Sequence, residues 1–178
     1  MKNKLKKIEL KKALIVLMAT FCCLNLQAKG NQSIFKIAVV EDAIGTQEIM
    51  KGRYRLGLEK LSTKSARSFS QYDIAMGECV AKLMIKQLTQ ASESCSNAIE
   101  VYKSKKGSQY RYLTSVAYSN RAVAQYKLGK INSALKDLEL AASIDDNDIV
   151  LENLTFLKSK LEKISSKTET SQETIAAD

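Results

Sequence analysis

Three residue types are missing from this sequence of 178 residues: it has no proline, no histidine and no tryptophan. Proline makes up about 5% of an average sequence and interrupts helices, so its absence favours helices joined by short polar turns. Without histidine, the chain has neither a histidine proton shuttle nor a histidine metal ligand.

Catalytic motifs are missing as well. The chain contains no G-x-S-x-G, no H-E-x-x-H, no C-x-x-C and no glycine-rich phosphate loop. Its scattered carboxylates, such as Glu41, Asp42 and Glu78, have no evident catalytic partner and are typical of charged helix faces. The sequence therefore predicts that the protein is not an enzyme and has no catalytic residues, no metal site and no cofactor.

Residues 1–28 have the pattern of an export signal. A lysine-rich start precedes the apolar run "ALIVLMATFCCLNL", and small Ala28 follows at a suitable cleavage point. Two alternatives stay open: a retained membrane anchor, although a span needs about 20 apolar residues, and a lipoprotein site at Cys22 or Cys23, which Phe21 disfavours. We expect a signal peptide and a periplasmic or secreted protein.

The leader carries much of the positive charge. The whole chain has a formal net charge of +9, and removal of the leader, with six lysines and one glutamate, would lower it to +4. The stretch "VYKSKKGSQYRYL" at 101–113 interleaves tyrosines with basic residues, a combination that can bind nucleic acid or acidic envelope material. A solvated basic loop is the simpler interpretation for an exported protein, so we expect no nucleic-acid partner.

The remaining chain divides into three parts. Residues 29–43, with "IFKIAVV", predict an extended segment lying on helices, because no second strand is visible to pair with it. Residues 44–164 have apolar stripes at helical spacing, and Gly52 interrupts the first of them. The polar residues 165–178 predict a disordered tail.

A repeat is visible at an offset of 43 residues. Small or apolar residues recur in four aligned pairs: Cys79 with Ala122, Ala91 with Ala134, Cys95 with Leu138, and Ala98 with Ala141. Small residues at fixed spacing indicate places where two helices approach closely, so we expect two successive helical hairpins.

The second hairpin resembles the tetratricopeptide repeat (TPR). In "YSNRAVAQYKLGKINSALKDLELAASIDD", the family's signature positions hold Tyr118, Ala122, Ala134, Leu138 and Ala141. Three positions depart from the signature, namely those of Arg121, Gln125 and Asp146. The resemblance implies an all-α fold: a short array of helical hairpins in an α-α superhelix. It comprises a degenerate repeat at 44–66, repeats at 72–105 and 115–148, and a capping helix at 148–164.

The resemblance also implies a groove lined by the first helix of each hairpin. The residues expected to face it and to bind a partner are Asp73, Met76, Val80, Leu83, Ser119, Asn120, Val123 and Lys127. An asparagine there can bond both the donor and the acceptor of an extended peptide. The alternative is that these residues pack against the N-terminal segment or the last helix. The "S-N-R-A" stretch is similar to carboxylate-binding members of the family, but their accompanying basic residues are not found here.

Cys79 and Cys95 are predicted to form a disulfide. If their helices run antiparallel around a bend at 86–90, residues with a mean number near 87 lie level with each other, and these two cysteines do. An oxidising compartment would then join them. Two buried free thiols are the alternative, and a redox switch lacks a basic neighbour or C-x-x-C spacing.

These observations together predict a non-enzymatic scaffold or adaptor of the bacterial cell envelope. We expect it to bind a peptide or protein segment in the groove. The alternative is a structural envelope protein tethered to the membrane by an uncleaved N-terminal signal anchor.

Overall fold

The computed structural model describes residues 34–63 and 70–175, with side chains to Ser166. The predicted signal peptide lies outside these residues. The chain divides into two units at Ser33, and everything below concerns the second unit, which starts at Ile34.

The described part of the chain consists of helices and irregular connections, without a strand. The all-α prediction is confirmed. In chain order the helices are α2 (Thr46–Met50), α3 (Tyr54–Leu61), α4 (Gln71–Met84), α5 (Leu88–Tyr102), α6 (Ser108–Lys127), α7 (Ile131–Ile144) and α8 (Asp148–Ile175). None of these helices is long and apolar enough to cross a bilayer.

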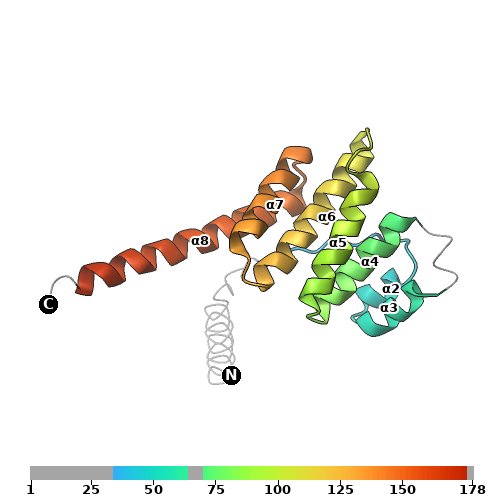
Figure 1. Ribbon diagram of the computed structural model, residues 1–178, viewed down its shortest axis with the longest axis horizontal. Helices are drawn as coiled ribbons and strands as arrows, with labels where there is room; N and C mark the ends of the chain where they lie inside the picture. The colour runs from blue at the N-terminus through green and yellow to red at the C-terminus, as the bar shows by residue number, and fades with distance from the viewer. Residues whose placement is uncertain (1–33, 64–69, 176–178) are drawn as a thin grey trace, which may run out of the picture. The chain divides into compact units, whose positions relative to one another are not determined.

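Each helix packs on the next along the chain, from α2 through α8. Helix α6 also contacts α4 and α8, and α5 and α7 pack against these three helices. In Figure 1 the helices α4 to α7 follow one another in chain order across the array. The hairpins turn sharply because Lys86 and Gly129, each two residues after the end of α4 or α6, adopt positive φ angles of 64° and 77°. The result is two layers of antiparallel helices, as the repeat predicts.

The predicted small-residue positions form the core of both hairpins. Ala91 and Ala98 of α5 are fully buried, as are Ala134 and Ala141 of α7. A disulfide joins Cys79 of α4 to Cys95 of α5, with their Cα atoms 5.0 Å apart. The antiparallel register inferred from the sequence therefore holds in the first hairpin.

Two predicted boundaries differ from the structure. Helix α6 begins at Ser108, seven residues before the repeat expected at 115–148. Helix α8 continues beyond 164 to Ile175, so the predicted disordered tail is wrong for residues 165–175. These residues include no glycine or proline, and adding a residue to an existing helix costs far less than starting one. The last three residues lie outside the described part.

Candidate functional site

Residues 34–40 lie across the first helices of the hairpins and fill the groove between them. Two buried asparagines hold their backbone. Asn120 of α6 accepts a hydrogen bond from the amide of Ala38 (3.0 Å) and donates one to its carbonyl (2.8 Å). Asn153 of α8 does the same with Lys36, at 2.7 and 2.8 Å. The two amide side chains thus read the main chain of alternate residues, a pattern that requires an extended segment.

The side chains of the segment alternate in direction, as they do in a strand. Phe35, Ile37 and Val39 pack against apolar clusters that include Val80, Leu83, Val123 and Leu138. Ala38 and Val40 instead join a cluster built on Tyr72, Met76 and Val116. Apolar clusters therefore surround Phe35, Ile37 and Val39 on one side and Ala38 and Val40 on the other.

Phe35 has the most specific pocket. Its ring centroid lies 5.0 Å from that of Tyr126 and 4.7 Å from that of Phe156, the second in an edge-on arrangement. Such pairs add to the free energy of apolar burial. The aromatic pocket is formed jointly by α6 and α8, so it exists only where the two helices meet.

We call Asn120 and Asn153 together the clamp. Further polar contacts orient the clamp and favour one sign of charge on the bound segment. Ser119 accepts a hydrogen bond of 2.8 Å from the Asn153 amide, which fixes the rotation of that side chain. Beside it, the Lys36 ammonium lies 2.6 Å from the Glu152 carboxylate, with both side chains about half exposed. An exposed pair of this kind contributes little stability, but it favours a positive charge at this position of the segment.

Six of the eight predicted groove residues come together here: Met76, Val80, Leu83, Ser119, Asn120 and Val123 are all buried. The other two are less buried. Asp73 is half-buried in the first turn of α4, and Lys127 is exposed at the end of α6. Because the chain's own segment covers the groove, the alternative considered for these residues, packing against the N-terminal segment, describes the structure. Whether a partner binds them stays a prediction.

Asn153 was missed by the sequence reasoning. It lies 33 residues after Asn120, close to the TPR period of 34 residues. Extending the repeat into the capping helix would have found it.

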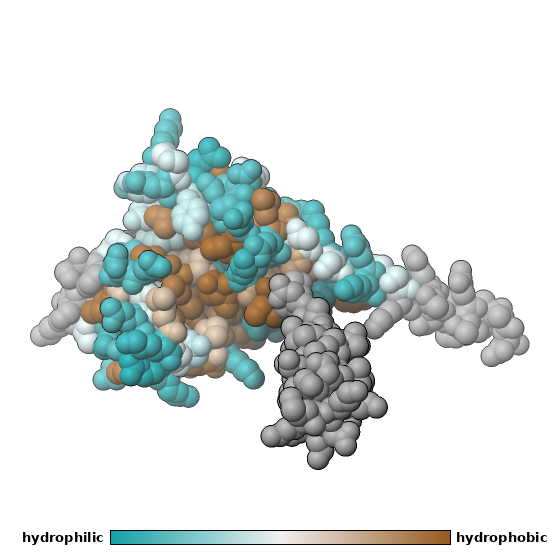
Figure 2. Space-filling view, turned by 180° about the vertical axis from the view of Figure 1, so that it is seen from behind, coloured by the Kyte–Doolittle hydropathy of each residue, from teal (hydrophilic) through white to brown (hydrophobic). Residues whose placement is uncertain are grey.

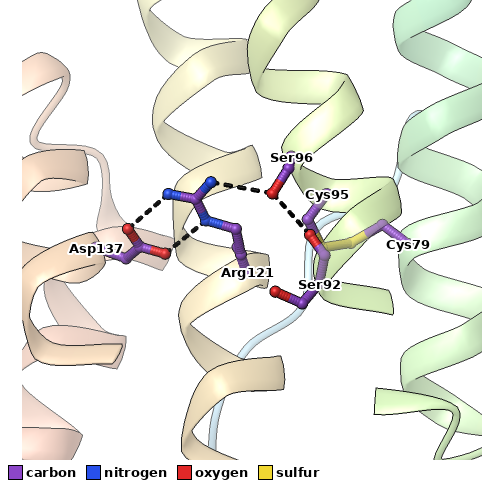
Figure 3. Close-up of polar contacts among 6 residues, drawn as sticks. All are labelled: Cys79, Ser92, Cys95, Ser96, Arg121 and Asp137. Atoms are coloured by element: carbon purple, nitrogen blue, oxygen red, sulfur yellow. Dashed lines mark hydrogen bonds and ion pairs between the residues drawn. A yellow bond between two sulfur atoms is a disulfide. The ribbon is translucent and has the colours of Figure 1, made fainter. Parts of the chain in front are cut away.

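Arg121, the arginine of "S-N-R-A", is used inside the fold. Its guanidinium forms two hydrogen bonds to Asp137 of α7, at 2.7 and 2.8 Å, and one of 3.0 Å to Ser96 of α5. Figure 3 shows this network bridging three helices, with the disulfide beyond it. The hydrogen bond to Asp137 raises the pKa of Arg121 despite partial burial. Arg121 therefore tightens the hairpin array and does not reach the groove.

Two of the three tyrosines of the basic stretch, Tyr102 and Tyr110, pack into a cluster of rings, whereas Tyr112 is 42% exposed. Tyr102 stacks on Tyr72 at a centroid distance of 4.8 Å and contacts Tyr110 at 5.0 Å. Tyr72 is fully buried, donates a hydrogen bond to the Leu113 carbonyl at 2.6 Å, and has its pKa raised by that burial. Tyr102 and Tyr110 are therefore used in packing within the fold, which leaves fewer exposed rings in this stretch for stacking on a ligand.

The face that carries the segment is apolar. In Figure 1 the segment is the blue trace that passes behind the helices, and Figure 2, seen from behind, shows an apolar area there. Ile34 at its start is 75% exposed.

Elsewhere, an open depression of about 280 Å³ lies between α4 and α5, bordered by Gln71, Ile74, Glu78 and Asn97 among others. No cluster of metal-ligating side chains occurs within residues 34–63 and 70–166.

Comparisons with known proteins identify the architecture. No protein-family model and no curated protein matches the sequence. A similar solved structure is the NMR structure of the second TPR domain of the human RPAP3 protein in complex with the HSP70 peptide SGPTIEEVD. The match has a TM-score of 0.52 and 23% sequence identity, and it covers 64% of this chain and 88% of that one. Over the matched part, the chain therefore has the fold of a tetratricopeptide repeat domain.

Proposed function

We propose that this protein is a non-enzymatic protein-binding module of the bacterial cell envelope. Domains of this fold bind other proteins through the face formed by the first helices of their hairpins, and the similar TPR domain was solved with a peptide. The export signal predicted at residues 1–28 supports the envelope location.

The paired asparagines carry the proposal. Asn120 and Asn153 each donate one hydrogen bond to the main chain of an extended segment and accept one from it. Main-chain bonds provide affinity without dependence on sequence, and the flanking apolar pockets provide selectivity. The groove thus has the two elements that a peptide-binding surface needs.

Site-directed crosslinking in living cells tests this function. A photoreactive residue at exposed Lys127, on the groove face of α6, should give a discrete adduct with an envelope protein. The same residue at exposed Lys136, on the outer helix α7, is the matched control and should not give that adduct. Equal adducts from both positions, or none from Lys127, would contradict binding through the groove face.

The mature N-terminus separates this function from a tethered structural role. Release by signal cleavage predicts an N-terminus at Lys29, whereas an uncleaved anchor predicts Met1. N-terminal sequencing of the protein from the envelope fraction decides between them.

A further inference from the structure

The segment that occupies the groove indicates which kind of ligand the groove can bind. We propose that it binds an internal, extended, apolar segment of a partner protein, and that this segment replaces residues 35–40, which occupy the groove as a self-ligand. The inference rests on the proposed function and adds the chemistry of the partner and the way it gains access.

The self-ligand defines the pattern that the groove accepts. An aromatic residue fits between Tyr126 and Phe156, as Phe35 does. Two positions later an aliphatic residue fits beside Leu83 and Val123. The position between these two tolerates a basic residue facing Glu152. The next position must be small, since Ala38 is 9% exposed against the Asn120 amide. The expected pattern is therefore aromatic, any or basic, aliphatic, small, aliphatic.

The clamp recognises the middle of a chain rather than its end. Both asparagines bond residues that continue in both directions, and they use the amide and the carbonyl of each. Among the described residues, they are the only side chains bonded to the backbone of the segment. The one nearby arginine, Arg121, is committed to Asp137 and Ser96. At the clamp itself, a terminal carboxylate or an acidic peptide would meet two neutral amides and the Glu152 carboxylate.

Exchange with a partner is energetically feasible because the self-ligand is held along one edge. The backbone groups of Phe35, Ile37 and Val39 have no hydrogen-bond partner among the described residues. A partner of the same pattern would restore every bond that displacement breaks. The self-ligand's remaining advantage is its covalent tether, which raises its effective concentration. Apparent affinity for a partner is reduced by the fraction of time that the groove is open.

Evicting the self-ligand should therefore expose a binding site. The probe is a fluorescent peptide of residues 34–42, "IFKIAVVED", added to the protein purified after expression of the full chain. In the variant Ala38→Asp, a carboxylate would be buried against Asn120 and Met76 without a counter-charge, so the tethered segment should leave the groove. We expect the variant to bind the probe at least about tenfold more tightly than the wild type. Gln47→Asp adds the same charge at an exposed position of α2 and should leave probe binding at the wild-type level.

Two further experiments test whether the increase in probe affinity arises in the groove. Adding Asn120→Ala and Asn153→Ala to Ala38→Asp should remove the gain, because the probe then loses both clamps. A C-terminally amidated probe should bind as tightly as one with a free carboxylate, because the clamp reads internal residues.

Circular dichroism must show that Ala38→Asp keeps its helices. If it does not, the pair Phe35→Ala and Ile37→Ala, which empties two pockets without adding a charge, takes its place.

Equal probe affinity in wild type and evicted variant would mean that the probe binds outside the groove, and would overturn the proposal. A strict requirement for the free carboxylate would overturn it too. In either case, groove-specific crosslinks from Lys127 would leave the proposed function standing, with a ligand of different chemistry.

Discussion

The hairpins α4–α5 and α6–α7 share a register 43 residues apart, yet they differ in the turn, in the core and on the groove face, at four aligned positions. The turn uses Lys86 in the first hairpin and Gly129 in the second. The core joins two cysteines in the first and packs Ala122 with Leu138 in the second. On the groove face, Gly77 of α4 stands where α6 has Asn120. One backbone plan therefore carries different chemistry in each repeat.

The difference on the groove face explains where the clamp ends. A Cβ atom at Gly77 would lie 3.0 and 3.1 Å from the two terminal methyl carbons of Leu61, so α3 already fills that space. Asn153 of α8 lies 33 residues beyond Asn120 and continues the clamp in the other direction. Asn120 on α6 and Asn153 on α8 thus bind the main chain, while α4 offers only apolar contacts. This asymmetry fixes the register of whatever lies in the groove.

Removing the disulfide should have the largest effect on stability. The pair Cys79→Ala and Cys95→Ala should lower the free energy of unfolding by about 3 kcal/mol, because the unfolded chain regains the freedom of a loop of this size. Urea unfolding of the oxidised wild type and the variant measures this. An unchanged midpoint would show that the first hairpin, like the second, relies on packing alone.

Overpacking the second hairpin should rank next. Ala134→Leu inserts a larger side chain into a fully buried contact between α6 and α7, and should cost about 1–3 kcal/mol. Lys136→Leu, at an exposed position of the same helix, is the control and should change stability little. Equal melting temperatures for both variants would contradict the close helix approach at Ala134.

The two clamps should contribute separately. Asn120→Ala and Asn153→Ala each remove two hydrogen bonds to the segment and should each cost about 1–2 kcal/mol. Gly77→Asn should destabilise the fold, because Leu61 already occupies the space of the new side chain. It should give no additional hydrogen bond to the segment. Thermal unfolding compares the three variants, and a cost for Asn120→Ala below the error of the measurement would remove Asn120 from the clamp.

The turn should give the smallest effect, and of opposite sign. Lys86→Gly relieves a positive φ that L-residues adopt at a cost of about 1–2 kcal/mol, partly offset by the larger unfolded-state freedom of glycine. We expect a gain in stability of at most about 1 kcal/mol by urea unfolding. A loss of stability would mean that the Lys86 side chain contributes contacts that its exposure does not suggest.

The helical register was predictable because small residues mark it directly. Ala91, Ala134 and the two cysteines report close helix contacts whatever surrounds them, and the observed hairpins follow those positions. The groove residues were expected from the resemblance to the TPR family, and six of the eight are buried beneath the segment.

The occupant of the groove and the second clamp were harder to predict. "IFKIAVV" is compatible with a strand, a buried helix segment or an extended chain, and only the tertiary contacts with Asn120 and Asn153 select the last. The role of Arg121 was equally hidden, because its partners Ser96 and Asp137 lie 25 and 16 residues away in the sequence. Such contacts depend on how the helices stack, which composition and spacing do not encode.

Amide hydrogen exchange along residues 35–39, followed by NMR on the full chain, tests the central claim most directly. The account predicts slow exchange at the amides of Lys36 and Ala38, which bond to Asn153 and Asn120. It predicts fast exchange at Phe35, Ile37 and Val39, whose amides have no hydrogen-bond partner among the described residues. Uniformly fast exchange at all five amides would show that the segment does not lie in the groove and would contradict the account.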